Sequence, residues 1–173
     1  MIGDPTYSRR KVRELLTGLV RLAHGRGARR ILLTSVEQGA GKTRLTASLK
    51  HEARSLPGAS IAFVSRAYLD RVQPADLGDH DLVLVDGPAV IDVDGLHDIP
   101  EVWRRGLDGA VLVVIKRRTR RVAVEEARRW LEANGIALLG VVWNEYTLPP
   151  VFVQLARVRA WIGRMFAGSK ERS

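Results

Sequence analysis

Short apolar runs alternate with amphipathic stretches along most of the chain. Five of these runs are rich in branched side chains, which is typical of strands that are buried on both faces of a sheet. The predicted strands are 31–35, 60–65, 81–86, 109–115 and 137–143. Apolar positions at helical spacing, and breaks rich in Gly and Pro, predict helices between them.

Some of the expected helices have marked ends. Residues 9–24 carry apolar side chains at helical spacing, and Gly25 and Gly27 are expected to end that helix. Thr119 is expected to cap a later helix, and Gly135 suits the left-handed position just after it. The apolar side of this later helix is formed by Val122, Ala123, Ala127, Trp130 and Leu131. The other predicted helices are 42–55, 100–106 and 151–167.

Strands that alternate with helices predict a parallel sheet of about five or more strands, with helices on both faces. The fold class is therefore α/β with three layers. No repeat or linker divides the chain, so we expect a single domain overall. Within it we distinguish an N-terminal helix in 1–28, the α/β domain in 29–168 and a tail in 169–173. In such sheets, ligands bind beyond the carboxyl ends of the strands.

A glycine-containing loop joins the first predicted strand to the helix that follows it. Gly39 and Gly41 allow the backbone to curl so that its N–H groups face phosphate oxygens. The helix that begins near Lys42 adds the positive end of its dipole, and the lysine side chain reaches the β- and γ-phosphates. Thr43 offers a hydroxyl to Mg²⁺. This pattern indicates a P-loop, although Val36 stands where the first glycine of the motif belongs.

The predicted strand 81–86 ends in Asp86 after a run of apolar residues. This arrangement is typical of the Walker B segment of P-loop NTPases, whose carboxylate holds Mg²⁺ or positions the attacking water. An aspartate at the end of a strand is common, so the prediction depends on the P-loop that precedes it.

Four segments together resemble the ATP-binding domain of bacterial tyrosine autokinases of capsule and exopolysaccharide synthesis, within the ParA/MinD-like P-loop class. They read TSVEQGAGKT, HDLVLVDGPAV, GLDGAVLVVIKRRTRR and NGIALLGVVWNEY, at 34–43, 80–90, 106–121 and 134–146. The resemblance implies a P-loop NTPase fold that binds ATP or ADP with Mg²⁺. It also implies a partner that is a membrane-associated polysaccharide-export or chain-length protein, and a homo-oligomer.

The resemblance assigns roles to matching positions. Lys42 and Asp86 would be the catalytic residues, and Thr43 and Asp86 would serve the metal. Asn144 would read the edge of the adenine with its amide, although a turn asparagine after a strand is the alternative. The predicted nucleotide-binding residues are Gly39, Ala40, Gly41, Lys42, Thr43, Arg44 and Asn144.

The chain departs from the family pattern at a second acidic motif. Ser65 and Ala67 stand where the family has two aspartates, and Asp70 comes three residues later. We therefore expect weak hydrolysis, because phosphoryl transfer needs charge neutralisation at the γ-phosphate. The tyrosine cluster that these kinases phosphorylate has no counterpart in 163–173. The family's N-terminal oligomerisation motif is matched only in part, at Arg10 and Arg13.

The amino-acid composition excludes several kinds of functional site. The chain has 173 residues and no cysteine, which excludes disulfides, thiol nucleophiles and thiolate metal sites. Lys and Arg number 28 against 19 Asp and Glu, a formal net charge of +9. Such a surface attracts phosphates, nucleic acid, acidic protein or anionic lipid, although arginines spread over solvated faces are the more common reason for such a charge. No apolar run is long enough to span a membrane and no signal peptide is visible, so we expect the cytoplasm, or its membrane face.

Three functions remain open from the sequence. The first is an accessory ATPase or nucleotide switch in polysaccharide synthesis or export. The second is a non-catalytic regulator whose nucleotide-bound shape is read by a partner. The third is a ParA-like ATPase that uses its basic surface on DNA, which we regard as the weaker prediction. The basic amphipathic segment 151–167 would pack on the sheet or lie on an anionic membrane.

Overall fold

The computed structural model describes residues 7–90 and 99–145. The elements alternate between helix and strand, with two short 3₁₀ helices in the connection between the second and third strands. In chain order they are α1 (Arg9–Arg26), β1 (Arg30–Ser35), α2 (Lys42–Ala53), β2 (Ile61–Val64), η1 (Arg66–Tyr68), η2 (Pro74–Leu77), β3 (Leu82–Ala89), α3 (Glu101–Gly106), β4 (Gly109–Ile115), α4 (Arg121–Ala133) and β5 (Leu138–Asn144).

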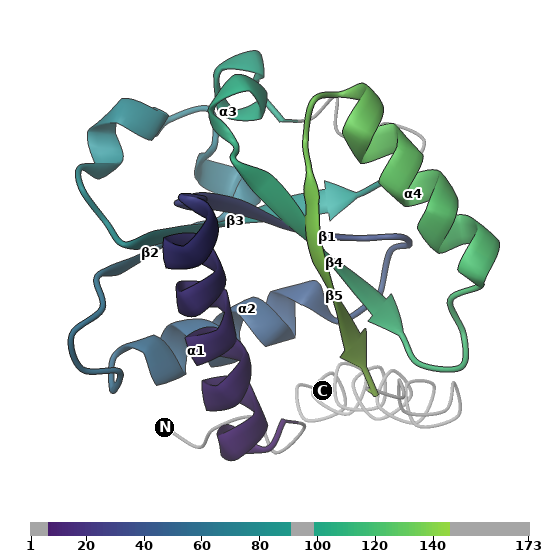
Figure 1. Cartoon of the computed structure of the whole chain (residues 1–173), viewed down its shortest axis with the longest axis horizontal. Coiled ribbons are helices and arrows are strands. Elements are labelled where there is room, and N and C mark those ends of the chain that lie inside the picture. Colours follow the sequence, from purple (N-terminus) through teal and green to yellow (C-terminus); the bar gives the residue numbers. More distant parts are fainter. Residues whose placement is uncertain (1–6, 91–98, 146–173) are drawn as a thin grey trace, which may run out of the picture.

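The strands form one parallel sheet in the order β2-β3-β1-β4-β5 (Figure 1). The strand that leads into the glycine loop, β1, is therefore central and lies between β3 and β4. Val64 at the end of β2 pairs with Val85 of β3, so Ser65 leaves the sheet at the level where Asp86 continues β3. This arrangement confirms the predicted α/β class.

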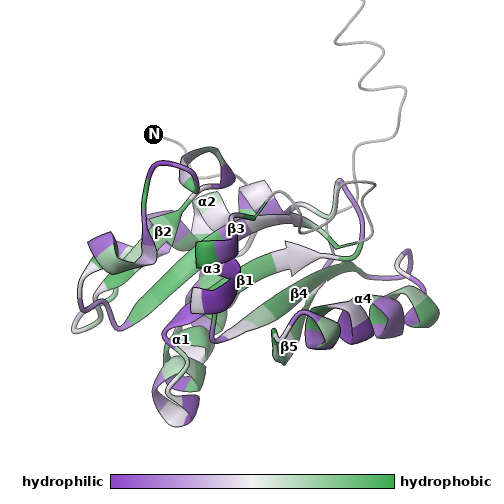
Figure 2. Ribbon diagram, turned by 90° about the horizontal axis from the view of Figure 1, so that it is seen from above, coloured by the Kyte–Doolittle hydropathy of each residue, from purple (hydrophilic) through white to green (hydrophobic). Residues whose placement is uncertain are grey.

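Alternate residues of each central strand enter two different cores. On β1, Ile31 and Leu33 pack in the core with α1 and α2, whereas Leu32 packs in the core with α3 and α4. All three side chains are at most 1% exposed. Figure 2 shows the apolar strands in the middle of the molecule and the hydrophilic residues gathered on the helices and connections. Burial on both faces explains why these strands read as continuous apolar runs.

Helix ends were predicted with mixed success. The first helix passes through Gly25 and ends at Gly27, which has φ 63° and whose N–H donates to the Ala23 carbonyl. The prediction that Gly25 ends the helix is therefore wrong, because only Gly27 adopts the left-handed conformation that stops a helix. Gly135, with φ 74°, has the left-handed conformation predicted for it after α4. Strand β3 continues three residues beyond the predicted end, to Ala89.

Thr119 does not cap α4, contrary to prediction. The N-cap is Arg120, which makes no side-chain capping bond. The Thr119 hydroxyl instead accepts a hydrogen bond from the Ile115 N–H at 2.9 Å and donates to the Glu37 carboxylate at 3.1 Å. Tertiary contact with the glycine loop has taken the place of local capping. Val122 was predicted on the apolar side of this helix but is 68% exposed.

Trp103 of α3 anchors the connection that follows β2. The indole is fully buried, and its N–H donates to the carbonyls of Leu69, at 3.0 Å, and Val72, at 2.9 Å. A buried indole with a satisfied N–H contributes both apolar area and a fixed geometry. The connection is thus tied to α3 at Leu69 and Val72, a few residues after Ser65 and Arg66.

Some predictions lie outside the described residues. They are the helix at 151–167, the tail at 169–173 and the part of the loop at 91–98. Over residues 7–90 and 99–145, no helix combines the length and the apolar character needed to cross a lipid bilayer.

Candidate functional site

The glycine loop between β1 and α2 has the geometry of an anion-binding loop. Gly39 and Gly41 have φ values of 75° and 81°, in the left-handed region that glycine adopts at low cost. Gly41 is the N-cap of α2, and the first turn of that helix has neither a side-chain cap nor an acidic residue. The N–H groups of that turn and the positive end of the dipole therefore favour an anion at this point.

Lys42 is tied to the strand that precedes the loop. Its ammonium donates to the Ser35 hydroxyl at 2.8 Å, and this hydroxyl in turn donates to the Glu37 carbonyl at 2.8 Å. The lysine also lines the cleft beside the loop. The charge that would face the phosphates is thus positioned by contacts with its own loop.

Asn144, at the end of β5, holds the loop from the other side. Its amide nitrogen donates to the Ala40 carbonyl at 2.7 Å, and the residue is 3% exposed. A Cβ added at Gly41 would overlap this amide and would lie 3.2 Å from the Tyr7 hydroxyl. Glycine is therefore needed at 41 both for its φ and for space. The sequence did not predict this contact, and the adenine-reading role of Asn144 stays a prediction.

A cleft of about 810 Å³ lies beside the loop, at the carboxyl ends of β2 and β3. It brings together most of the residues predicted for phosphate and metal. Its lining consists of Gln38, Gly39, Lys42, Thr43, Ser65, Arg66, Ala67, Asp70, Asp86, Gly87, Pro88 and Ala89. Ala40, Gly41, Arg44 and Asn144, which were also predicted to bind nucleotide, do not line this cleft.

Asp86 is the half-buried carboxylate of the cleft. Burial raises its pKa, and the charges of Lys42 and Arg66 act in the opposite direction without cancelling the effect. Strand β3 continues past Asp86, and the Pro88 carbonyl accepts a hydrogen bond from the Thr34 hydroxyl at 2.6 Å. Asp86 is thereby fixed against β1, facing the phosphate loop.

The residues of the cleft fit a magnesium ion with few protein ligands. The Thr43 hydroxyl and the Asp86 carboxylate both line it, and oxygen donors of this kind are the ligands that Mg²⁺ prefers. Mg²⁺ usually keeps several waters, so two protein ligands are sufficient. Among residues 7–90 and 99–145, no group of three or more His, Cys, Asp or Glu side chains could hold a metal by itself.

Ser65 and Ala67, the neutral residues that the sequence resemblance aligns with two aspartates, both line the cleft. Val64, which precedes Ser65, pairs with Val85, which precedes Asp86. Asp70 also lines the cleft and is exposed. The cleft therefore has one half-buried carboxylate and one exposed carboxylate.

A second cavity, of about 740 Å³, lies between the start of α1 and the end of β5. Tyr7, Lys11, Trp143 and Asn144 are among the residues that line it. The Tyr7 hydroxyl donates to the Gly41 carbonyl at 3.5 Å. Since Asn144 also bonds to Ala40, this cavity adjoins the phosphate loop on the side away from β2.

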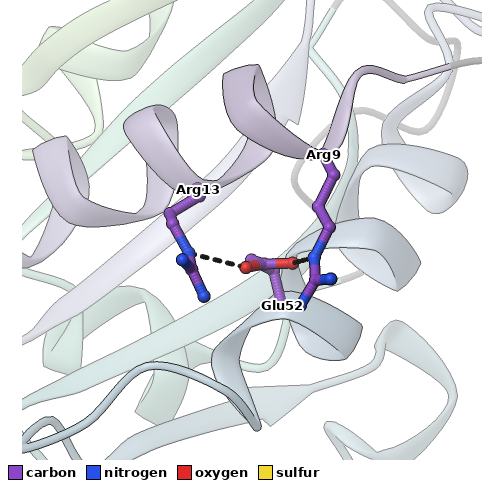
Figure 3. A network of polar contacts seen from close by, with 3 residues as sticks. All are labelled: Arg9, Arg13 and Glu52. Atoms are coloured by element: carbon purple, nitrogen blue, oxygen red, sulfur yellow. Dashed lines mark hydrogen bonds and ion pairs between the residues drawn. The ribbon is translucent and has the colours of Figure 1, made fainter.

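Helix α1 is held to α2 by ion pairs between the buried Glu52 and two arginines at the surface (Figure 3). The Glu52 carboxylate is 2% exposed and accepts hydrogen bonds from Arg9, at 2.9 Å, and Arg13, at 2.7 Å. Burial raises the pKa of Glu52, but the hydrogen bonds and charges of the two arginines outweigh it and hold the pKa below its usual value. Arg10, the other residue of the partial oligomerisation motif, lies 3.7 Å from Glu14 instead.

Comparisons with known proteins relate the chain by fold. A scan against family models and a search of curated proteins found no match. The BceF tyrosine kinase domain superposes with a TM-score of 0.61 over 79% of this chain and 77% of its own, at 20% identity. The kinase domain of the Escherichia coli tyrosine kinase ETK superposes with a TM-score of 0.62 over 82% of this chain and 78% of its own, at 17% identity. The VpsO kinase domain superposes with a TM-score of 0.59 over 80% of this chain and 96% of its own, at 13% identity. The chain thus has the α/β fold of bacterial tyrosine kinase domains.

Proposed function

We propose that this protein binds ATP or ADP with Mg²⁺ and acts as an accessory ATPase or nucleotide switch in polysaccharide synthesis or export. One observation carries the nucleotide-binding part of the proposal. Gly39, Lys42 and Asp86 line one cleft beside the N-terminus of α2, whose N-cap is the left-handed Gly41. The pathway is supported by the sequence resemblance and by the tyrosine kinase folds that the chain resembles.

Different groups of the chain would bind the phosphates and the metal. The loop backbone around Gly39 and Gly41 donates N–H groups to phosphate oxygens, and Lys42 adds a charge toward the β- and γ-phosphates. Thr43 and Asp86 would hold the metal between them. When bound, Mg²⁺ neutralises charge that develops on the phosphoryl group. Asp86 would also orient the attacking water.

Slow turnover follows from the second acidic position. Ser65 is a neutral hydroxyl at the place next to Asp86 where the resembling kinases have a carboxylate. A hydroxyl neither offsets the charge of a cation nor accepts a proton at neutral pH. Nucleotide binding rests on the loop backbone and Lys42, so it does not depend on that carboxylate.

Titration calorimetry with Mg·ATP and Mg·ADP tests the nucleotide site. Wild-type protein should bind both, and Lys42→Ala should lower the affinity at least tenfold, because a charge-assisted contact with phosphate is lost. Lys50→Ala is the matched control, since Lys50 lies on the same helix, is exposed and does not line the cleft. Equal affinities of wild type and Lys42→Ala would contradict the P-loop assignment.

The partner proposed from the resemblance is a membrane-associated polysaccharide-export or chain-length protein, met at the cytoplasmic face of the membrane. A homo-oligomer belongs to the same proposal. Genes for polysaccharide glycosyltransferases or chain-length regulators beside this gene would support the pathway. Measured turnover separates an accessory ATPase from a regulator that only binds nucleotide.

A second candidate, a ParA-like ATPase that acts on DNA, is favoured by one surface feature. The turn between β4 and α4, together with the first residue of α4, carries four exposed arginines at the carboxyl edge of the sheet, and Thr119 in this turn contacts the phosphate loop. The arginines are Arg117, Arg118, Arg120 and Arg121. Binding to unrelated duplex DNA that weakens steeply with salt, and is lost when these arginines are replaced, would favour this function.

A further inference from the structure

Arg66 occupies an unexpected place in the cleft. It is the second residue after β2, directly after Ser65, it is exposed, and it lines the same cleft as Gly39 and Lys42 of the phosphate loop. Trp103 holds the connection that begins here through the carbonyls of Leu69 and Val72. The arginine is therefore presented from an anchored segment, at the edge of the sheet where phosphates would lie.

The charges that line the cleft are evenly divided. Lys42 and Arg66 are cations, and Asp70 and Asp86 are the carboxylates. An aspartate at 65 would make carboxylates the majority and would supply a further ligand to a metal. Because Ser65 is neutral, the two carboxylates of the described lining do not outnumber the two cations, which remain available to attract phosphate.

Arg66 and Lys42 act on the same carboxylate from two elements. Both charges lower the pKa of Asp86, against the larger effect of burial. The lysine comes from α2 and the arginine from the turn after β2, so Asp86 lies within the field of both. A terminal phosphate above Asp86 would lie within the same field.

A guanidinium is suited to this position. It stays charged at any physiological pH and presents a planar set of donors that matches two phosphate oxygens at once. We propose that the Arg66 guanidinium binds the terminal phosphate of a bound nucleotide, so that this chain holds ATP with little dependence on Mg²⁺. The inference rests on the proposed nucleotide-binding function. It separates binding, which the two cations support, from hydrolysis, which still needs the metal.

The test is titration of ATP and ADP in the presence of MgCl₂ and, separately, of EDTA. When the metal is chelated, the ATP affinity of wild type should fall by less than about tenfold. Arg66→Gln should lower ATP affinity in EDTA by about 10- to 100-fold, the effect of one charge-assisted bidentate contact, and ADP affinity by much less. Arg66→Lys should keep only part of the wild-type ATP affinity in EDTA, because an ammonium lacks the bidentate geometry of a guanidinium.

Arg71→Gln is the control, since Arg71 is an exposed arginine of the same connection outside the cleft lining. Circular dichroism and thermal unfolding of each variant establish that it is folded. If wild type binds ATP in Mg²⁺ but not in EDTA, or if Arg66→Gln matches wild type in EDTA, the role of Arg66 is wrong while the nucleotide site stands. If wild type binds no nucleotide under either condition, the proposed function is wrong and this inference falls with it.

Discussion

Asn144 and Ala40 are 104 residues apart in the chain, yet the asparagine amide donates to the alanine carbonyl at 2.7 Å. This hydrogen bond joins the end of the edge strand β5 to the phosphate loop. Both partners are buried, at 3% and 2% exposure. The shape of the loop therefore depends on a strand that is separated from β3 and Asp86 by two strands of the sheet, β1 and β4.

The first prediction concerns this bond. Asn144→Ala leaves the Ala40 carbonyl without its partner in a buried site, so the free energy of unfolding should fall by about 1–3 kcal/mol. Nucleotide affinity should fall as well, because the loop loses a fixed point. Urea unfolding and calorimetry measure the two effects. Asn134→Ala removes a similar amide bond, to the Trp130 carbonyl at 2.8 Å, from an exposed site and should cost less. Equal losses in the two variants would contradict the prediction.

The second prediction concerns the ion pair that fastens α1 to α2. The pKa of Glu52 is below its usual value, so the ionised form stabilises the fold above the unfolded-state pKa of about 4.3. That contribution is lost as the pH falls through the lower folded-state pKa. Glu52→Gln should therefore be less stable than wild type by about 1–3 kcal/mol at pH 7, and the difference should shrink below pH 4.

The two sides of this ion pair should respond differently to mutation. Arg9 and Arg13 have side chains that are 71% and 50% exposed, so they turn to water when Glu52 is replaced. Glu52 is 2% exposed, and the double variant Arg9→Gln/Arg13→Gln leaves its charge without these two partners, so it should be less stable than Glu52→Gln. Urea unfolding of both variants at pH 7 compares them. A double variant more stable than Glu52→Gln would show that the glutamate finds another partner.

The fold was predictable because its signals are local. The central strands are continuous apolar runs, since both of their faces are buried, and Gly39, Gly41 and Lys42 are adjacent in sequence. The contacts that complete the site are not local. Asn144 bonds to Ala40, 104 residues away, and Thr119 bonds to Glu37, 82 residues away, so neither contact could be predicted from a local pattern. A local propensity of Thr for the N-cap gave way to a tertiary contact.

The third prediction separates stability from function at Asp86. Its pKa is raised, chiefly by burial, so the ionised carboxylate destabilises the fold at pH values above its folded-state pKa, and protonation relieves this at lower pH. Asp86→Asn should therefore be more stable than wild type by about 0.5–2 kcal/mol at pH 7 and by less at pH 4, while Mg²⁺-dependent hydrolysis is lost. Urea unfolding at both pH values and phosphate release measure these effects. Asp79→Asn, at a fully exposed carboxylate, should show no such gain. A destabilised Asp86→Asn protein would mean that the carboxylate is held by attraction to Lys42 and Arg66.

The fourth prediction restores the missing carboxylate. Val64 pairs with Val85, so an aspartate at 65 would stand beside Asp86 at the edge of the cleft. A lost electrostatic or acid–base group typically costs on the order of 10²–10³ in rate, so Ser65→Asp should raise the rate of phosphate release, by up to about 100-fold. Ser65→Asn has nearly the same shape without the charge and should leave the rate unchanged, whereas Asp86→Ala should abolish it.

The rates of these variants must be compared with the rate of the wild-type protein. If wild type already turns over at about 1–100 per second, as ordinary kinases do, Ser65 is not a deficiency and the weak-hydrolysis proposal is wrong. Asp70, which lines the same cleft, would then be the carboxylate to replace next. If instead Ser65→Asn accelerates the reaction as much as Ser65→Asp, the gain comes from side-chain shape or hydrogen bonding. An electrostatic gain should also grow at low ionic strength and vanish below the pKa of the new carboxylate, because only its ionised form attracts the metal.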